Sequence, residues 1–327
     1  MKIRKLCAIL AASSLMLLGA CADSGDEGGS SPAAGDDQTG TTGKPIIGLV
    51  MKSLGNAYFQ GMQAGAEEYA AANTDKFELR SVGTQSETDI DGQIDAVKNM
   101  IAQKVDAIVI APADSQALIA PLKEAADAGI KVINIDVKLD DEALAQAGLD
   151  IPFVGPDNVE GARMSGEVLA EALGEGAKVV IIEGISGAAN AQQRKAGFDE
   201  AVANGKLDLV ASQSADWETD KANTVFTNLL TANPDIQGVM CANDSMALGV
   251  IAALETAQNT TIKVVGFDNV PEVQPLLDNG KLLATIDQFG NSQAQFGIEG
   301  ALALLSGGTP EAWVKTKLEL IKSSAAG

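Results

Sequence analysis

The sequence has 327 residues, a formal net charge of −21 and no histidine. Such acidity argues against nucleic acid as a partner. The absence of histidine excludes a Ser-His-Asp catalytic site, histidine metal ligands and the commonest general base.

Residues 1–20 are predicted to be a targeting segment, because basic residues near the start precede a short apolar run. The run is too short to span a membrane as a mature helix. It ends in Leu18-Gly19-Ala20-Cys21, which resembles the lipobox of bacterial lipoproteins. That resemblance implies cleavage before Cys21 and acylation of its thiol. The alternative is an ordinary signal peptide, cleaved at a small residue nearby.

The segment 22–43 contains no large apolar side chain and is rich in Gly, Ser, Asp and Pro. Such a segment cannot bury enough surface to fold, so residues 21–43 are predicted to be a flexible tether that begins at the acylated Cys21. A tether between a lipid anchor and a folded body predicts an extracytoplasmic protein held at a membrane in the cell envelope. Cys241 is the one cysteine left beyond this region, so an intramolecular disulfide is excluded.

Strand-like and helical stretches alternate from Pro45 onward. Pro45–Met51 has the length and composition of a buried parallel strand, and a helix is predicted after Asn56. The alternation predicts βαβ units and a parallel sheet. The following strands are predicted at 77–82, 107–111 and 132–136, with helices at 90–104 and 117–128.

A second series of the same kind begins near Phe153, where Asp157 and Glu160 form a predicted helix cap. Residues 44–327 are therefore predicted to form an α/β fold of two doubly wound lobes, with the first crossover at 148–156. The strands of the second series are predicted at 178–182, 207–211, 238–241, 262–267 and 282–286, and the units between them at 194–202, 221–231, 245–257 and 270–277.

Polar side chains follow the predicted strands at their carboxyl ends, where ligands bind in open α/β sheets. Donors, acceptors and an aromatic face together suit the hydroxyls and the C–H patch of a sugar. Histidine, a P-loop and a G-x-G-x-x-G after a strand are all missing, which argues against an enzyme on a two-lobed α/β scaffold. The side chains that follow the predicted strands in this way are Lys52, Ser53, Asn56, Asp114, Asp136, Asn190, Arg194, Trp217, Asn243 and Asp268.

Eight local strings occur in order along residues 45–320: NAYF (56–59), APADS (111–115), INID (133–136), PDNVEGA (156–162), GAANAQQRKAGF (187–198), ANDSMALG (242–249), VVGFD (264–268) and LLATIDQ (282–288). Together they resemble the ribose-type solute-binding proteins of sugar ABC transporters. The resemblance implies the type I periplasmic binding protein fold, in which a three-stranded hinge joins two Rossmann-like lobes with parallel sheets. Lobe one would comprise 45–156 and 289–315, and lobe two 157–288 and 316–327.

The resemblance also implies a monomeric receptor that is not an enzyme and needs no cofactor or metal. It would capture a monosaccharide or sugar alcohol and deliver it to the membrane subunits of an ABC transporter. A sensor that presents its ligand to a chemoreceptor or kinase is an alternative, and a sugar-acting enzyme on the same scaffold is another.

Three positions depart from the family's pattern of sugar contacts. Lys52 stands where the ribose binder has a serine, Ala111 replaces an asparagine and Val137 replaces an arginine. These departures indicate a ligand other than ribose, either another monosaccharide or an acyclic sugar alcohol. The contacts that the resemblance carries over are Asn56, Tyr58, Phe59, Asp136, Asn190, Arg194, Trp217, Asn243, Phe267, Asp268 and Gln288.

Some of these residues have a plainer interpretation. Tyr58 and Phe267 could serve the core, Lys52 could be a solvated surface charge, and Arg194 could pair with a carboxylate on its own helix. Trp217 has no apolar neighbour in sequence and is predicted to be exposed and to stack on the ligand. Three aspartates are interpreted as caps or turn residues and are left out of the site: Asp114, Asp157 and Asp244.

Overall fold

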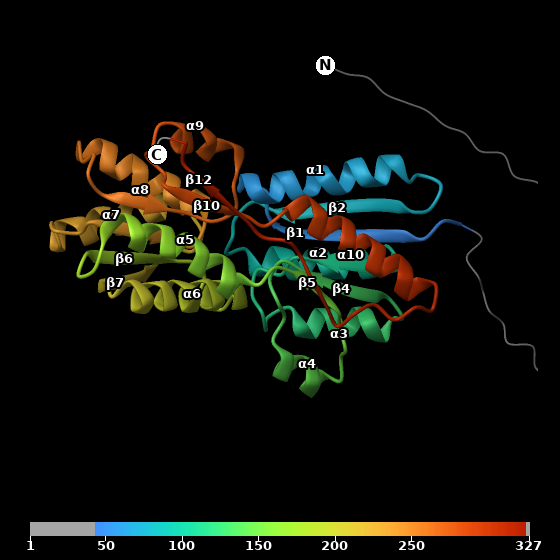
Figure 1. Ribbon diagram of the computed structural model, residues 1–327. Helices are drawn as coiled ribbons and strands as arrows, with labels where there is room; N and C mark the ends of the chain where they lie inside the picture. Colours follow the sequence, from blue (N-terminus) through green and yellow to red (C-terminus); the bar gives the residue numbers. More distant parts are fainter. Residues whose placement is uncertain (1–42, 325–327) are drawn as a thin grey trace, which may run out of the picture. The chain divides into compact units, whose positions relative to one another are not determined.

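The computed structural model describes residues 43–324, which form two six-stranded sheets (Figure 1). The predicted signal segment, Cys21 and almost all of the tether lie outside the described residues. Between residues 43 and 324, no helix is long and apolar enough to cross a membrane.

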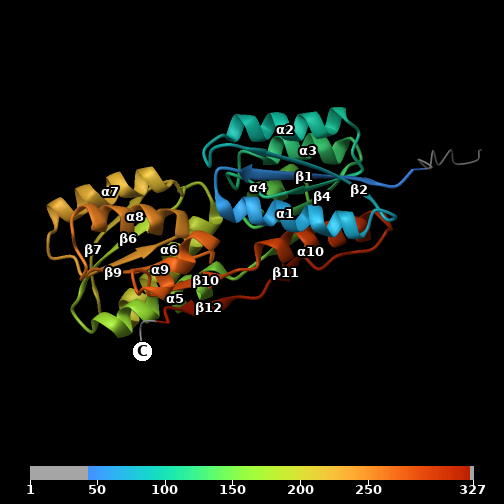
Figure 2. The same ribbon diagram turned by 90° about the horizontal axis from the view of Figure 1, so that it is seen from above.

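The first sheet has the strand order β11-β5-β4-β3-β1-β2, and each neighbouring pair is parallel. This sheet and its helices are called the first lobe below. Figure 2 shows α2 and α3 on one side of β1 and α1 on the other. The elements are β1 (Ile46–Ser53), α1 (Ala57–Ala72), β2 (Glu78–Thr84), α2 (Ile90–Ala102), β3 (Ala107–Ile110), α3 (Ile119–Asp127), β4 (Lys131–Ile135), α4 (Asp141–Ala147), β5 (Phe153–Gly155), α10 (Gly290–Leu305) and β11 (Trp313–Lys315).

The second sheet has the order β12-β10-β9-β8-β6-β7 and, with its helices, forms the second lobe. Its pairs are parallel except β10–β12, which is antiparallel. The elements are α5 (Asn158–Leu173), β6 (Lys178–Glu183), α6 (Ala189–Gly205), β7 (Asp208–Ser214), α7 (Thr219–Ala232), β8 (Gly238–Cys241), α8 (Asp244–Thr256), β9 (Lys263–Val265), the 3-10 turn η1 (Pro271–Val273), α9 (Gln274–Asp278), β10 (Ala284–Asp287) and β12 (Glu319–Lys322).

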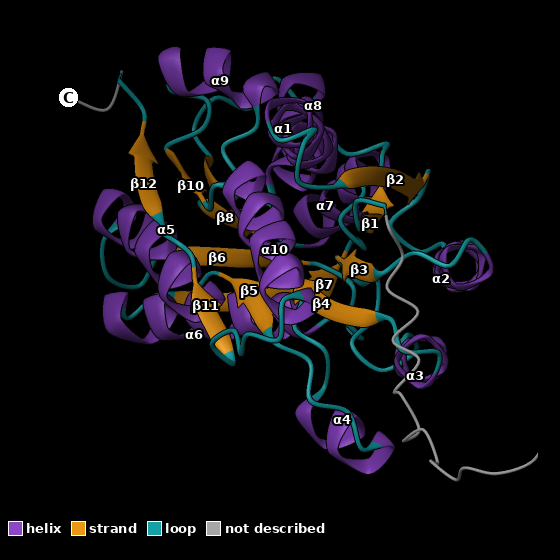
Figure 3. Ribbon diagram, turned by 90° about the vertical axis from the view of Figure 1, so that its right-hand side faces the viewer, coloured by secondary structure: helices purple, strands orange, loops and turns teal. Residues whose placement is uncertain are grey.

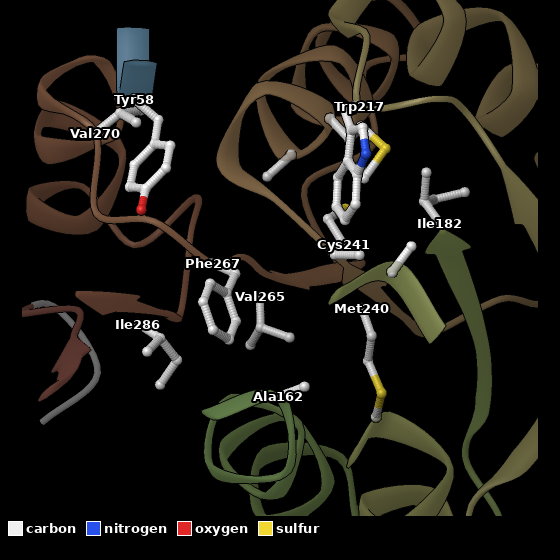
Figure 4. Packing of buried hydrophobic residues seen from close by; sticks show 14 of the residues in the cluster. Tyr58, Ala162, Ile182, Trp217, Met240, Cys241, Val265, Phe267, Val270 and Ile286 are labelled. Carbon is white, nitrogen blue, oxygen red and sulfur yellow. The ribbon is translucent and has the colours of Figure 1, made fainter. Parts of the chain in front are cut away.

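Both faces of each sheet are covered, which explains why the strands read as continuous apolar runs. Successive side chains of β1 point to opposite faces. Val50 packs into the apolar cluster with α2 and α3, whereas Leu49 and Met51 pack into the cluster with α1 and α10. In the second lobe, Phe267 gathers with Val265 and other apolar side chains of the sheet (Figure 4).

The chain passes between the two sheets three times within the described residues. It does so between β5 and α5, between β10 and α10, and between β11 and β12. Figure 3 shows β11 beside β5, its partner in the first sheet. The fold class is therefore confirmed, with one antiparallel edge strand, β12, that was not predicted; the residue limits of the lobes stay a prediction.

Local signals set several element ends. Asp157 caps α5, since its Oδ1 accepts a hydrogen bond from Glu160 N at 3.1 Å, as interpreted from the sequence. Gly129, with φ +87°, follows the end of α3. The short helix α4 was not predicted, although Asp140 caps its start and Gly148 its end.

Gln93 ties the ends of β1 and β3 together from α2. It is fully buried, its Nε2 donates to the carbonyls of Met51 (3.3 Å) and Ala111 (2.8 Å), and its Oε1 accepts from Ala113 N at 2.7 Å. Met51 lies in β1 just beyond its last pair with β3, Val50 with Ile110, and Ala111 and Ala113 follow β3, so the ladder between these two strands has ended there. A single side chain thus replaces ladder hydrogen bonds at the edge from which the loops emerge.

Gln93→Leu should lower the free energy of unfolding by about 2–4 kcal/mol, because it leaves buried backbone groups without partners. Urea unfolding followed by circular dichroism measures this change. The matched control is Gln146→Leu, an exposed position on α4 bonded to Glu142 in the same helix, which should change stability by less than about 0.5 kcal/mol. Equal stability of both variants would contradict the assigned role of Gln93.

Candidate ligand-binding site

A small buried cavity lies at the carboxyl ends of the strands of both lobes. The cavity has a volume of about 10 Å³, which is roughly enough to hold one water molecule. Residues of both lobes line the cavity. In each lobe it lies at the carboxyl ends of the strands, where ligands bind in open α/β sheets. The lining residues are Lys52, Asn56, Tyr58, Phe59, Glu87, Asp136, Asn190, Arg194, Trp217, Asn243, Asp268 and Gln288.

All but two of the predicted site residues line this cavity. Ser53 is buried beside it and donates to Gln85 O at 3.2 Å. Phe267 is fully buried in the core of the second lobe, as the plainer interpretation proposed (Figure 4). Glu87 was not predicted, although it follows β2 just as the other polar residues follow their strands, and the same rule would have found it.

Arg194 reaches the cavity from α6 and is held on three sides. Its Nε donates to Asn158 Oδ1 at 2.9 Å, and its Nη1 donates to Ala242 O at 2.8 Å and to Asp268 Oδ1 at 3.3 Å. The guanidinium lies 3.7 Å from the centroid of the Phe267 ring. A surface ion pair within its own helix, the plainer interpretation, is therefore wrong for Arg194.

Asp136 follows β4 and presents one free acceptor. Tyr58 OH donates to its Oδ1 at 3.2 Å, whereas its buried Oδ2 has no hydrogen-bond partner among residues 43–324. Burial raises the pKa of Asp136, and the charges of Lys52 and Arg194 oppose that rise. Burial also raises the pKa of Tyr58 well above its usual value, so its hydroxyl stays protonated and donates.

Asp268 follows β9 in a backbone conformation that L-residues seldom adopt, with φ +118°. Gln288 Nε2 donates to its Oδ1 at 2.6 Å. Burial raises the pKa of Asp268 to about 7; the Arg194 charge lowers that pKa and the Asp136 charge adds to the rise. The loop is braced from below by Asp244, which is fully buried and accepts from Thr285 Oγ1 at 2.8 Å and Val270 N at 3.1 Å.

Lys52 and Glu87 form a second buried ion pair. The distance from Lys52 Nζ to Glu87 Oε2 is 3.2 Å, and both side chains are 2% exposed. Asn56 Nδ2 donates to Glu87 Oε1 at 2.8 Å, while Asn56 Oδ1 caps α1 by accepting from Tyr58 N. Burial raises the pKa of Glu87 and the Lys52 charge opposes the rise. The interpretation of Lys52 as a solvated surface charge is therefore wrong.

Trp217 is 2% exposed, so its predicted exposure is wrong. Its ring lies against the backbone of Gly184 after β6, where a Cβ atom would be 2.1 Å from Cζ2 of the ring. Glycine at that position makes the burial possible, and the pattern around the tryptophan carries no sign of it. Its Nε1 has no hydrogen-bond partner among the described residues.

The two asparagines of the second lobe that line the cavity, Asn190 and Asn243, differ in which of their polar atoms lack a partner. Asn243 caps α8 by accepting from Met246 N at 2.8 Å, and its Nδ2 donates to Trp217 O at 3.4 Å. Asn190 Oδ1 is buried and has no hydrogen-bond partner in the described part of the chain. Asp114 stays outside the lining and accepts from Gln116 N and Ala117 N, as a turn residue does.

The two lobes touch directly beside the cavity. Ser115 N donates to Gly187 O at 3.1 Å, and Ala189 N donates to Ser115 Oγ at 2.9 Å. Glu87 N donates to Glu218 Oε1 at 3.3 Å. The cavity is therefore closed by bonds between a strand-end loop of one lobe and those of the other.

The free groups of the cavity match a neutral ligand with several hydroxyls. Asp136 Oδ2 and Asn190 Oδ1 accept, Trp217 Nε1 donates, and a hydroxyl can act in both ways. The aromatic rings of Phe59 and Trp217 offer a face to C–H groups. Within residues 43–324, no cluster of three or more His, Cys, Asp or Glu side chains could hold a metal ion.

The raised pKa of Asp268 predicts a pH dependence of stability. An acid whose pKa is higher in the folded than in the unfolded chain stabilises the fold below its unfolded pKa, and this contribution is lost as pH rises to about 7. Between pH 5 and pH 8, the unfolding free energy of the wild type should therefore fall by about 2–3 kcal/mol relative to Asp268→Asn, which cannot titrate. Urea unfolding of both proteins at several pH values measures this difference; a constant difference would contradict it.

Comparison with known proteins places the chain in a family. The family model for the periplasmic binding protein domain matches residues 47–309. The D-ribose/D-allose-binding protein of Pseudomonas aeruginosa is 48% identical over 286 residues, which cover 86% of this chain and 90% of that protein. The ribose import binding protein RbsB of Escherichia coli is 36% identical, with coverage of 85% and 90%.

Two solved structures share the fold and much of the sequence. A solute-binding protein of an ABC transporter from Burkholderia multivorans, with an unknown ligand interpreted as α-D-erythrofuranose, matches with a TM-score of 0.83, 45% identity and coverage of 86% and 100%. A periplasmic solute-binding protein from Actinobacillus succinogenes with bound D-allose matches with a TM-score of 0.81, 40% identity and coverage of 86% and 98%. This chain belongs to the periplasmic binding protein family, and within it to the ribose-type sugar-binding proteins.

Proposed function

We propose that this protein is an extracytoplasmic receptor that captures a monosaccharide or sugar alcohol between its two lobes and delivers it to the membrane subunits of an ABC transporter. The observation that carries the proposal is the cavity lined from both lobes, with buried polar atoms on Asp136, Asn190 and Trp217 that lack protein partners among residues 43–324. Family membership and the sugars bound by the relatives support it.

The charges of the cavity favour a neutral ligand. Lys52 pairs with Glu87 and Arg194 pairs with Asp268, so both cations are already compensated. Asp136 is left as a strong acceptor for a hydroxyl, because hydrogen bonds to an ionised group are about twice as strong as neutral ones. Ligands without the matching hydroxyl would leave buried groups unpaired, which gives such a site its selectivity. We propose binding without catalysis, as these residues are engaged in holding the ligand and one another.

Three substituted positions, Lys52, Ala111 and Val137, bear on the identity of the sugar. Ala111 and Val137, which replace two donors of the ribose pattern, are fully buried and outside the cavity lining. Lys52 is inside it. The relatives are named for ribose and allose, and the ligand of one solved structure is interpreted as a four-carbon furanose. We propose that the ligand of this chain is a monosaccharide or sugar alcohol other than ribose.

We further propose that the protein is a monomer anchored to the membrane through a lipid on Cys21, with residues 22–43 as the tether. The support for the anchor is the sequence Leu18-Gly19-Ala20-Cys21, which resembles a lipobox. These residues lie outside the described part of the chain. One acyl chain holds a protein only weakly at a membrane, so stable anchoring requires at least two.

A thermal-shift screen of the purified protein against pentoses, hexoses and C4–C6 polyols tests the receptor proposal. A ligand at about 100 times its dissociation constant adds about 2.7 kcal/mol to the stability of the folded state. For a chain of this size that corresponds to a rise in melting temperature of roughly 5 °C. A protein freed of carried-over ligand that responds to no member of the panel would contradict the proposal.

Asp136→Ala and Asp268→Ala should each raise the dissociation constant of the ligand found in that screen by at least about 30-fold. The reason is that truncating one partner of a buried charged hydrogen bond costs about 2 kcal/mol or more. Isothermal titration calorimetry measures the change. Asp75→Ala, at an exposed turn after α1, is the control and should bind as the wild type does. Wild-type affinity in both site variants would show that the ligand binds elsewhere.

Cys21→Ser should abolish lipid attachment, because serine lacks the thiol that is acylated. When the membrane fraction of cells is extracted and partitioned with detergent, we expect the wild type in the detergent phase and the variant in the aqueous phase. Cys241→Ser, at a buried strand position, controls for the loss of a thiol as such. If the wild type also enters the aqueous phase, the protein has an ordinary cleaved signal peptide.

A further inference from the structure

We propose that Gln293, which lies on α10 outside the cavity lining, is a positioning residue of the binding site. It sets the direction in which the Tyr58 hydroxyl and the Gln288 side chain donate, so that each donates to a carboxylate of the site. This inference rests on the proposed function and extends it to a residue that does not line the cavity. The observation that carries it is the set of contacts made by the amide nitrogen of Gln293.

A backbone carbonyl fixes the orientation of the Gln293 amide. Gln293 is fully buried, and its Nε2 lies 3.0 Å from the carbonyl oxygen of Gln288. A carbonyl oxygen only accepts hydrogen bonds, so the amide atom that faces it must be the nitrogen, which only donates. Turning the amide round would bring two acceptor oxygens together inside the protein. The donor end of Gln293 therefore faces the crossover between β10 and α10.

This orientation decides where the Tyr58 hydroxyl directs its hydrogen. Gln293 Nε2 lies 3.1 Å from the hydroxyl oxygen, which must accept, because an amide nitrogen offers only hydrogens. The single hydrogen of the hydroxyl is then directed to Asp136 Oδ1, 3.2 Å away. The other oxygen of Asp136, Oδ2, has no hydrogen-bond partner among residues 43–324 and is left to accept from a ligand.

The same nitrogen orients the side-chain amide of Gln288. Gln293 Nε2 lies 3.3 Å from Gln288 Oε1, and the oxygen end must face it, because two NH₂ groups cannot bond to each other in this position. Gln288 Nε2 is thereby turned toward Asp268 and donates to its Oδ1 at 2.6 Å. Gln293 thus orients a donor toward a carboxylate of the first lobe and another toward a carboxylate of the second.

Two further observations separate positioning from ordinary packing. Gln293 Oε1 is buried and has no hydrogen-bond partner in the described part of the chain, which is unfavourable for the fold and which an apolar side chain would avoid. An ideal Cβ atom at Gly290 would lie 2.7 Å from Cε2 of the Tyr58 ring, so glycine allows the first turn of α10 to approach this closely. A locally unfavourable residue at the end of a close approach is typical of a functional position.

The test compares Gln293→Leu with the wild-type residue in purified protein that carries Tyr69→Phe. The chain has two tyrosines, so this background leaves Tyr58 alone, and ¹³C labelling of tyrosine Cζ gives one NMR signal that reports on its hydroxyl. Gln293→Met, which is unbranched like glutamine, is the second variant in case leucine disturbs the packing. The control is Gln295→Leu, the same substitution on the same helix, where the amide bonds to Glu299.

We expect the Tyr58 signal to move in both Gln293 variants of the ligand-free protein and to stay in place in the control. Tyr58, Asp136 and Gln293 all belong to the first lobe, so this readout requires no closure of the lobes. By calorimetry, the dissociation constant of D-ribose or D-allose, whichever the wild type binds more tightly, should rise about tenfold in both variants. In a Tyr58→Phe background, Gln293→Leu should cost at most about threefold, because the hydroxyl that it orients is gone.

An unmoved Tyr58 signal would overturn the inference. So would an affinity loss of the same size with and without the Tyr58 hydroxyl, since Gln293 would then act through packing alone. Failure of the wild type to bind any sugar or polyol is a different result. It overturns the proposed function, whereas the Tyr58 signal of the ligand-free protein still decides whether Gln293 orients the hydroxyl.

Discussion

The buried ion pair of Arg194 and Asp268 is the interaction on which the site depends. Taking charges out of water is costly, and removing one partner of a buried pair costs about 3–5 kcal/mol. Here the guanidinium is also bonded to Asn158 and Ala242 and lies over the Phe267 ring. The pair therefore joins α5, α6, β8 and the loop after β9 into one rigid wall of the cavity.

The same wall contains Asp268, whose strained backbone conformation is stabilised by its neighbours. Asp268 has φ +118°, a conformation whose free-energy cost is of order 1–3 kcal/mol. Asp244 and Thr285 bond to one another under its loop, and Gln288, in the crossover after β10, donates to its carboxylate. Gln293 on α10 then donates to Gln288 O and to the Tyr58 hydroxyl, which connects this wall to Asp136 in the first lobe. The hydrogen bonds around Asp268 thus extend from the second lobe, through Gln288 and Gln293, to Tyr58 and Asp136 in the first lobe.

Much of this arrangement could be predicted from the sequence, and the reason is geometric. The strand at Pro45–Met51 and its repeats are read from apolar runs, and parallel strands present their carboxyl ends at one edge. Polar residues such as Asp136 and Asp268 therefore come together even though the chain between them is long. Gln288 was found by resemblance alone, because its position depends on a crossing between lobes that no local pattern shows.

The sequence could not show what depends on partners far away in the chain. Trp217 has a polar neighbourhood in sequence, and its burial depends on the missing side chain of Gly184, some 30 residues earlier. Lys52 is a lysine without an acidic neighbour in sequence, and its burial depends on Glu87, which lies 3.2 Å from its Nζ and comes from a different strand end. Phe267 directly precedes Asp268 in the sequence, yet its side chain lies in the core of the second lobe, because successive side chains at a strand end point to opposite sides.

The most direct test of the binding site is a crystal structure of the protein with the ligand that stabilises it most. We expect a ligand enclosed by both lobes, with one hydroxyl oxygen within about 3.2 Å of Asp136 Oδ2, another within that distance of Asp268, and its carbon skeleton beside the Trp217 ring. A ligand bound outside this cavity, or inside it without contact to either carboxylate, would contradict the assignment of the site.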